Sequence, residues 1–240
     1  MSVSRTVHGA SIGILMLETA FPRIPGDLGH AGSWSFPVLY RVVRGASAAT
    51  ALGGDSTQLL QPFIEAARDL VATGADGITT SCGFLSLFQQ ELKAAVAVPV
   101  AASSLMQVPM IQALLPPGKR VGVLTVDGQA LTAAHLRAAG AAEDTPVVGT
   151  EAGREFTRVI LDDEPCMDIE QCRKDNVEAA QKLLRHYPDV GAIVLECTNM
   201  VPYANDIQRA TGLPVYSIHG FINWFQSGLR PPVFPASHAS

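Results

Sequence analysis

Short apolar runs alternate with helix-like segments along the chain. The apolar runs have strand length and few polar positions, which is typical of parallel strands buried on both faces. The helix-like segments carry apolar residues three and four positions apart, and the segment 58–73 ends at Gly74. The alternation therefore predicts an α/β fold built on parallel sheets. The predicted strands are residues 11–17, 37–43, 76–81, 99–103, 120–126, 145–149, 190–196 and 214–218, and the predicted helices are 58–73, 85–95, 105–115, 131–139, 175–186 and 202–210.

The second half of the chain repeats the pattern of the first half. Ile12-Gly13-Ile14 corresponds to Val121-Gly122-Val123, and the distance from Cys82 to Pro99 equals the distance from Cys197 to Pro214. An internal repeat is the simplest explanation, and it predicts two pseudo-twofold-related, doubly wound parallel-sheet lobes with the active site between them. We expect strand 214–218 to return toward the first lobe. The predicted boundaries are 1–105 and 217–240 for lobe 1, carrying Cys82, and 106–216 for lobe 2, carrying Cys197.

Cys82 and Cys197 each follow a predicted strand and precede a predicted helix. A single cysteine in this position is usually a small buried hydrophobe. Ligands of parallel sheets, however, bind at the carboxyl ends of the strands, and equivalent residues of two related lobes are expected to face each other. The helix N-terminus after each cysteine is expected to lower the thiol pKa. The pair therefore predicts a site with one thiol on each side of a substrate.

Glu196 is the direct neighbour of Cys197. A negative charge there would raise the pKa of the thiol. Alternation along the strand predicts that the Glu196 side chain points away from Cys197, toward solvent or an ion-pair partner.

Composition and charge restrict the possible partners. The formal net charge is −5 and basic residues do not cluster, which argues against nucleic-acid binding. No apolar run reaches the ~18–20 residues that cross a bilayer, so we expect no membrane association. The four cysteines form no C-x-x-C pair and match no common zinc spacing, which predicts free thiols in a reducing cytoplasm and no metal site.

The two half-domains, the strand–cysteine–helix turns and Cys197-Thr198-Asn199 resemble the aspartate/glutamate racemase superfamily. That group includes the aspartate, glutamate and hydantoin racemases, maleate isomerase and arylmalonate decarboxylase. The resemblance covers nearly the whole chain. It implies catalysis without pyridoxal phosphate or metal, in which one cysteine thiolate removes the proton α to a carboxylate or carbonyl and the other thiol protonates the opposite face. Cys82 and Cys197 match these two positions, so we predict a cofactor-independent racemase or epimerase, expected to be a homo-oligomer.

Residues beside the two cysteines, and at the ends of other strands, are expected to bind a small carboxylate or carbonyl substrate. His219 is equally consistent with a structural, hydrogen-bonded histidine. The predicted substrate-binding residues are Ser81, Gly83, Phe84, Thr198, Asn199, Thr19, Thr125 and His219.

The sequence also departs from the amino-acid racemases that it resembles. Gly83 and Phe84 stand where those enzymes have Asn-Thr, and Asn199 stands where they have His or Glu. Phe84 removes a polar contact to an α-amino group, which predicts a bulkier or less polar substrate than glutamate or aspartate. Cis-trans isomerisation, as in maleate isomerase, remains an alternative. Decarboxylation is less favoured, because those relatives lack the first cysteine, and a non-catalytic small-molecule binding protein is the alternative outside enzymes.

Overall fold

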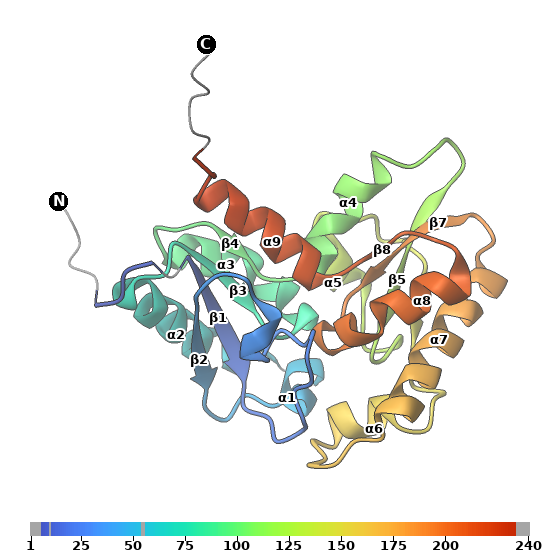
Figure 1. Cartoon of the computed structure of the whole chain (residues 1–240), viewed down its shortest axis with the longest axis horizontal. Coiled ribbons are helices and arrows are strands. Elements are labelled where there is room, and N and C mark those ends of the chain that lie inside the picture. The colour runs from blue at the N-terminus through green and yellow to red at the C-terminus, as the bar shows by residue number, and fades with distance from the viewer. Residues whose placement is uncertain (1–5, 10, 54–55, 234–240) are drawn as a thin grey trace, which may run out of the picture.

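Two four-stranded parallel sheets form the centre of the molecule (Figure 1), as seen in a computed structural model that describes residues 6–9, 11–53 and 56–233. The first sheet has the order β2-β1-β3-β4 and the second has the equivalent order β6-β5-β7-β8. The predicted α/β fold with two related lobes is therefore confirmed. The strands are β1 (Ile12–Leu17), β2 (Val38–Val43), β3 (Gly77–Thr80), β4 (Val100–Ala101), β5 (Arg120–Thr125), β6 (Val147–Gly149), β7 (Val190–Leu195) and β8 (Val215–Tyr216).

Strand β1 shows why the apolar runs are continuous. All six of its residues are buried, and alternate side chains pack into different clusters. Leu15 and Leu17 belong to the main hydrophobic core, whereas Ile12, Ile14 and Met16 pack in a second cluster with residues of the last helix. Because both faces of the strand are covered, polar alternation is absent.

Helices cover both faces of the sheets. Helix α2 buries Phe63, Ala66, Ala67 and Leu70, and Gly74 ends it with a φ of 141° that favours glycine. The helices are α1 (Ala48–Leu52), α2 (Leu60–Thr73), α3 (Gln89–Ala95), α4 (Gln107–Gln112), α5 (Ala133–Ala138), α6 (Phe156–Leu161), α7 (Ile169–His186), α8 (Ala204–Thr211) and α9 (Ile218–Leu229). Short 3-10 helices are η1 (Ala31–Ser33), η2 (Ser56–Leu59), η3 (Gly83–Phe88), η4 (Ser104–Met106) and η5 (Thr198–Tyr203).

Several elements differ from the sequence prediction. Helices α1, α6 and α9 were not predicted. Helix α7 begins at Ile169 rather than at residue 175, because the Asp168 side chain caps it by accepting a hydrogen bond from the Gln171 N–H at 3.0 Å. Strand β8 does not return to the first lobe, since it pairs with β7. Helix α9 makes that return instead and contacts β3. The exact lobe boundaries stay a prediction.

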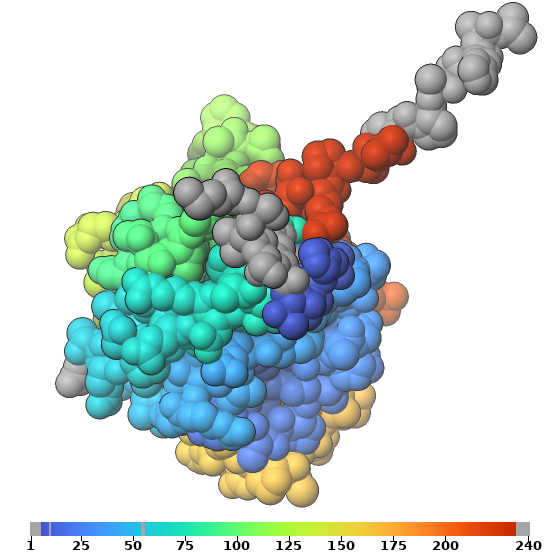
Figure 2. Space-filling view, turned by 90° about the vertical axis from the view of Figure 1, so that its left-hand side faces the viewer, coloured from blue at the N-terminus to red at the C-terminus, as the bar shows by residue number. Residues whose placement is uncertain are grey.

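The two lobes meet along the carboxyl ends of their central strands. Helices α1 and α6, one from each lobe, contact each other below the sheets in Figure 1. Viewed from the side of the first lobe, the blue and teal segments form one surface, and the yellow segment of α6 lies beneath it (Figure 2). Within the described ranges, no helix has the length and apolar character needed to cross a membrane.

Candidate active site

A small, partly enclosed cavity lies between the lobes, where β3 and β7 end. Its volume is about 20 Å³, which is close to the space of one water molecule. Cys82 and Cys197 both line it, so the structure brings the two predicted thiols to one site. Its other lining residues are Leu17, Phe21, Arg23, Ala48, Leu52, Ser81, Gly83, Phe84, Val126, Ile160, Glu196, Thr198 and Asn199.

Cys82 occupies the turn between β3 and η3. The Thr80 hydroxyl donates to the carbonyl oxygen of Ala102 at 2.7 Å, which ties this turn to β4. The backbone N–H groups of Phe84 and Leu85 point at the sulfur and favour the thiolate, as expected at a helix start. Burial acts more strongly, and together with the Glu196 charge it raises the pKa of Cys82 to about 12. The expected net lowering of the Cys82 pKa is therefore wrong in this structure.

Cys197 occupies the equivalent turn between β7 and η5. Its thiol donates a hydrogen bond to Asn199 Oδ1 at 3.5 Å, which favours the protonated form. Burial, followed by the charge of Glu196, raises the pKa of Cys197 well above its usual range, although the Asn199 N–H acts in the opposite direction. The expected lowering is wrong here too. The two thiols differ in their charged neighbours, since Arg23 favours the Cys82 thiolate whereas Asp27 disfavours that of Cys197.

The two cysteine turns are joined directly. The Thr198 hydroxyl donates to the carbonyl oxygen of Ser81 at 2.7 Å, across the boundary between the lobes. The Ser81 hydroxyl in turn accepts from the Leu17 N–H at 2.9 Å, at the end of β1. Because Ser81 and Thr198 are both buried, these bonds fix the relative position of the turns with little competition from water.

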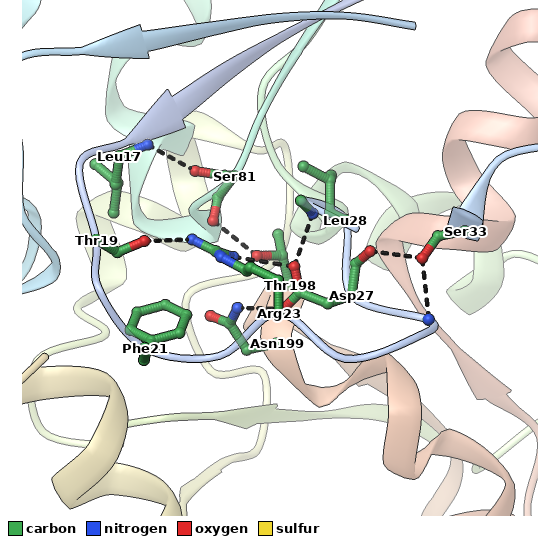
Figure 3. A network of polar contacts seen from close by, with 12 residues as sticks. Leu17, Thr19, Phe21, Arg23, Asp27, Leu28, Ser33, Ser81, Thr198 and Asn199 are labelled. Carbon is green, nitrogen blue, oxygen red and sulfur yellow. Dashed lines mark hydrogen bonds and ion pairs between the residues drawn. The ribbon is translucent and has the colours of Figure 1, made fainter. Parts of the chain in front are cut away.

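A polar network runs from the second turn into the loop after β1 (Figure 3). Asn199 Nδ2 donates to Asp27 Oδ2 at 2.6 Å, and Arg23 Nη1 donates to Asp27 Oδ1 at 3.0 Å. Arg23 Nη2 also donates to Thr19 Oγ1 at 2.8 Å, and its guanidinium lies 4.4 Å from the Phe21 ring centre. Arg23 thus lines the cavity with its guanidinium group held by Asp27, Thr19 and the Phe21 ring.

Sequence reasoning missed Arg23 and Asp27. Their sequence signal is a pair of opposite charges four positions apart in a long loop rich in proline and glycine. In the structure Asp27 is buried, which is uncommon for a carboxylate. Thr19, which was predicted to contact substrate, does not line the cavity and supports Arg23 instead.

Glu196 does not point to solvent or into an ion pair. Its side chain has no exposed surface and lines the cavity beside both cysteines. Thr125 donates to its Oε2 at 2.7 Å, so Thr125 acts on the carboxyl group rather than on the cavity itself. Burial raises the pKa of Glu196 to about 8. The expectation failed because β7 ends at Leu195, and Glu196 already belongs to the turn that packs against Gly83.

Gly83 and Phe84 line the cavity from the first lobe. The Phe84 ring packs edge-on against His135, with 5.1 Å between ring centres. Gly83 leaves room for the Glu196 carboxyl, because a Cβ at this position would overlap Oε1 and the Glu196 carbonyl oxygen. Five predicted substrate-binding residues therefore line the cavity: Ser81, Gly83, Phe84, Thr198 and Asn199.

His219 lies elsewhere. Its ring stacks on Trp34, its Nε2 is 2.9 Å from the Ser33 carbonyl oxygen, and it lines a separate groove between α4 and α9. The strand end that was expected to carry it to the cysteines leads into α9 instead. Among residues 6–9, 11–53 and 56–233, no group of three His, Cys, Asp or Glu side chains is arranged to hold a metal ion.

The chain is similar in sequence to known proteins, although no family model matches it. The chain is 30% identical over 240 residues to a dimethylsulfoniopropionate lyase of Durusdinium sp. clade D, covering 93% of this chain and 79% of the relative. It is 29% identical over 230 residues to dimethylsulfoniopropionate lyase 7 of Emiliania huxleyi, covering 91% and 67%.

Solved structures share the fold. A mutant of arylmalonate decarboxylase in its sulfate-associated form matches with a TM-score of 0.62 at 17% identity, covering 92% of this chain and 97% of that chain. A glutamate racemase isoform from Bacillus anthracis matches with a TM-score of 0.60 at 14% identity, covering 91% and 82%. The chain belongs to the dimethylsulfoniopropionate lyase family, and it shares its fold with the decarboxylase and racemase structures.

Proposed function

We propose that the protein is a lyase that cleaves dimethylsulfoniopropionate by β-elimination. A cysteine thiolate takes the proton α to the carboxylate, the electron pair of that C–H bond forms the C=C bond, and the pair of the C–S bond leaves with sulfur. The products are dimethyl sulfide, acrylate and one proton. The observation that carries the proposal is the likeness to named lyases along nearly the whole chain, combined with two cysteines that line one cavity.

Elimination and racemisation share their first step, the removal of an α-proton. The predicted racemase or epimerase chemistry therefore remains a second candidate, and the presence of two thiols on one cavity favours it. The steps that follow differ. A racemase must return a proton to the opposite face, whereas a lyase needs one base and a leaving group.

The sulfonium group lowers the demands on the site. An amino-acid racemase without pyridoxal phosphate must stabilise a full enolate with preorganised donors. In dimethylsulfoniopropionate, the departing sulfur accepts the electron pair as it forms, so less charge accumulates on the carboxylate. The substrate also has no α-amino group, which agrees with an apolar Phe84 at the position where amino-acid racemases have a polar residue.

We assign the base to Cys82. Two backbone N–H groups point at its sulfur, and the positive charge of Arg23 also favours its thiolate. Cys197 is already hydrogen-bonded as a donor to Asn199, which suits a group that stays protonated. A cationic substrate beside Cys82 would lower its pKa further, so that the thiolate forms when the substrate is bound.

Arg23 is the group proposed to hold the substrate carboxylate. It is the cation on the cavity wall, and its bonds to Asp27 and Thr19 leave further N–H donors for a carboxylate. Because the cavity of about 20 Å³ is smaller than the substrate, binding requires the loop between β1 and β2 to move outward and close again.

The test is an incubation of the purified protein with dimethylsulfoniopropionate in deuterated water. Headspace chromatography measures dimethyl sulfide, and NMR measures acrylate and deuterium at the α-carbon of remaining substrate. We expect stoichiometric dimethyl sulfide and acrylate. Deuterium exchange into chiral carboxylates, including glutamate and aspartate, without dimethyl sulfide release would reject the lyase and favour the racemase.

A further inference from the structure

Glu196 has an unusual environment for a carboxyl group. The side chain is fully buried, Thr125 satisfies Oε2, and among the described residues no donor reaches Oε1. A buried carboxyl oxygen without a partner costs free energy, so such groups are rare outside functional sites. Gly83 creates the space for this oxygen, since any side chain there would overlap it. The site thus keeps an unsatisfied acidic oxygen at the cavity wall.

When Glu196 is ionised, the charges around the cavity are not balanced within it. Arg23 and Glu196 are the charged residues among those that line it. Arg23 is paired with Asp27, and no salt bridge found within the described residues involves Glu196. The polar groups that face Glu196 are the thiols of Cys82 and Cys197 and the Thr125 hydroxyl, and none of them carries a positive charge. A cationic ligand group would supply the missing partner.

Resting on the proposed lyase function, we propose that Glu196 recognises the onium cation of the substrate, with its carboxylate against the sulfonium. A dimethylsulfonium ion has no N–H or O–H, so it balances a charge without forming a conventional hydrogen bond. Its methyl groups require apolar contacts, and Leu17, Phe21 and Phe84 line the same cavity. Arg23 and Glu196 would then hold opposite ends of a zwitterion, and the substrate is selected by its charge pattern.

The protonation of Glu196 links this recognition to pH. Burial raises its pKa to about 8, so the carboxyl is mainly neutral at pH 7 and an entering cation must displace its proton. The pKa values of Cys82 and Cys197 are raised far above this range, and His135, whose pKa burial lowers, packs on Phe84 from α5. Onium binding should therefore strengthen as pH rises from about 6 to 8 and release a proton below pH 8.

Two probes separate charge recognition from shape. Trimethylammoniopropionate carries an onium cation, and isocaproate has nearly the same shape as dimethylsulfoniopropionate with a neutral carbon in place of sulfur. Isothermal titration calorimetry in buffers of different ionisation enthalpy measures affinity and proton release between about pH 6 and 9. For the wild-type protein we expect the onium probe to bind more tightly with rising pH and to release a proton, and isocaproate to show neither effect.

The matched variants are Glu196→Gln and Thr125→Val. Glu196→Gln should weaken the onium probe roughly 10- to 100-fold, remove its pH dependence, and change isocaproate binding less than about threefold. Thr125→Val removes a hydrogen bond that favours the charged carboxylate of Glu196. The pH at which onium binding strengthens should therefore rise, while the preference for the onium probe persists. Equal losses for both probes in Glu196→Gln, or no pH dependence in the wild-type protein, would overturn the proposal.

Turnover is measured separately. If wild-type protein releases no dimethyl sulfide but shows the onium preference, the lyase assignment fails and the role of Glu196 stands for another onium carboxylate. If Glu196→Gln cleaves dimethylsulfoniopropionate with unchanged kcat and KM, the lyase stands and the role of Glu196 is rejected.

Discussion

The Thr198 hydroxyl donates a hydrogen bond to the backbone carbonyl of Ser81, 2.7 Å away and 117 positions earlier in the chain. Each of these residues is the neighbour of one active-site cysteine. The bond therefore joins the ends of β3 and β7 and sets how the two thiols face the cavity. The bond connects equivalent turns of the two repeated lobes, so that each turn fixes the position of the other.

Replacing Thr198 with Val removes this bond with little change in shape. The buried Ser81 carbonyl loses its partner, so we expect unfolding free energy to fall by about 1–2 kcal/mol and kcat to fall at least tenfold. Denaturant unfolding and steady-state kinetics measure the two effects. Thr211→Val is the control, because it removes a similar hydroxyl-to-carbonyl bond within α8. Unchanged kcat in Thr198→Val would show that the interlobe bond does not position the thiols.

The two cysteines are expected to be unequal. Removing a general base typically lowers rates by about 10²–10⁴, so Cys82→Ser should lose dimethyl sulfide release by such a factor. Cys197→Ser should lose less than about tenfold, because elimination does not need a proton returned to carbon. Cys166→Ser, at an exposed cysteine, should behave as wild type. Equal and complete loss in both active-site variants would instead indicate that both thiols move protons.

Stability should depend on pH through Glu196. Its pKa is raised from 4.5 to about 8 in the folded state, so between these values the unfolded chain has released the proton that the native protein retains. The stabilisation is complete below pH 4.5 and is lost as pH rises to 8, by an amount on the order of 5 kcal/mol. Glutamine cannot ionise, so Glu196→Gln does not lose stability in this way. The unfolding free energy of the variant should therefore increase relative to that of the wild-type protein from pH 5 to pH 9. A constant difference across urea titrations in that range would contradict the burial of an ionisable Glu196.

A substitution of Gly83 tests the contact between Gly83 and Glu196. Alanine at this position would overlap Glu196 Oε1 and its carbonyl oxygen, so the turn or the carboxyl must shift. We expect Gly83→Ala to lose about 1–3 kcal/mol of stability and most of the activity. In Gly228→Ala, a Cβ meets no atom within 4 Å in helix α9, so stability should stay equal or rise by up to about 1 kcal/mol. Thermal melting and dimethyl sulfide release compare the two, and an active, stable Gly83→Ala would exclude a packed Glu196.

The sequence predicted what local pattern encodes. Continuous apolar runs indicated both sheets, and the equal spacing from Cys82 to Pro99 and from Cys197 to Pro214 indicated two matching turns. Helix α9 was missed even though Ile218, Phe221 and Ile222 follow a helical spacing, because Gly220 and Gly228 lower the helix propensity of the segment.

Features made by contacts between the lobes could not be predicted in the same way. The direction of Glu196 depends on Gly83 from the other lobe, and the role of Arg23 depends on a loop that folds over the second turn. The pKa of each thiol was expected to be low because the local helix N-terminus favours a thiolate, but burial between the lobes outweighs it. The local sequence indicates that the helix N-terminus lowers the thiol pKa, but it does not indicate how deeply the thiol is buried between the lobes.

Asp163 provides a test of loop movement at a residue that does not line the cavity. Its Oδ1 accepts hydrogen bonds from the N–H groups of Ala20 and Phe21, at 2.6 and 3.2 Å, and so ties the loop after β1 to the second lobe. Asp163→Ala should release this tie and favour the open loop. The closed form then costs more to reach, so we expect KM to rise several-fold, with a smaller change in kcat if closure still occurs. Asp162→Ala, at the exposed neighbour, is the control. If Asp163→Ala leaves both constants unchanged, while limited proteolysis shows faster cleavage in the loop, access to the cavity does not pass through this segment.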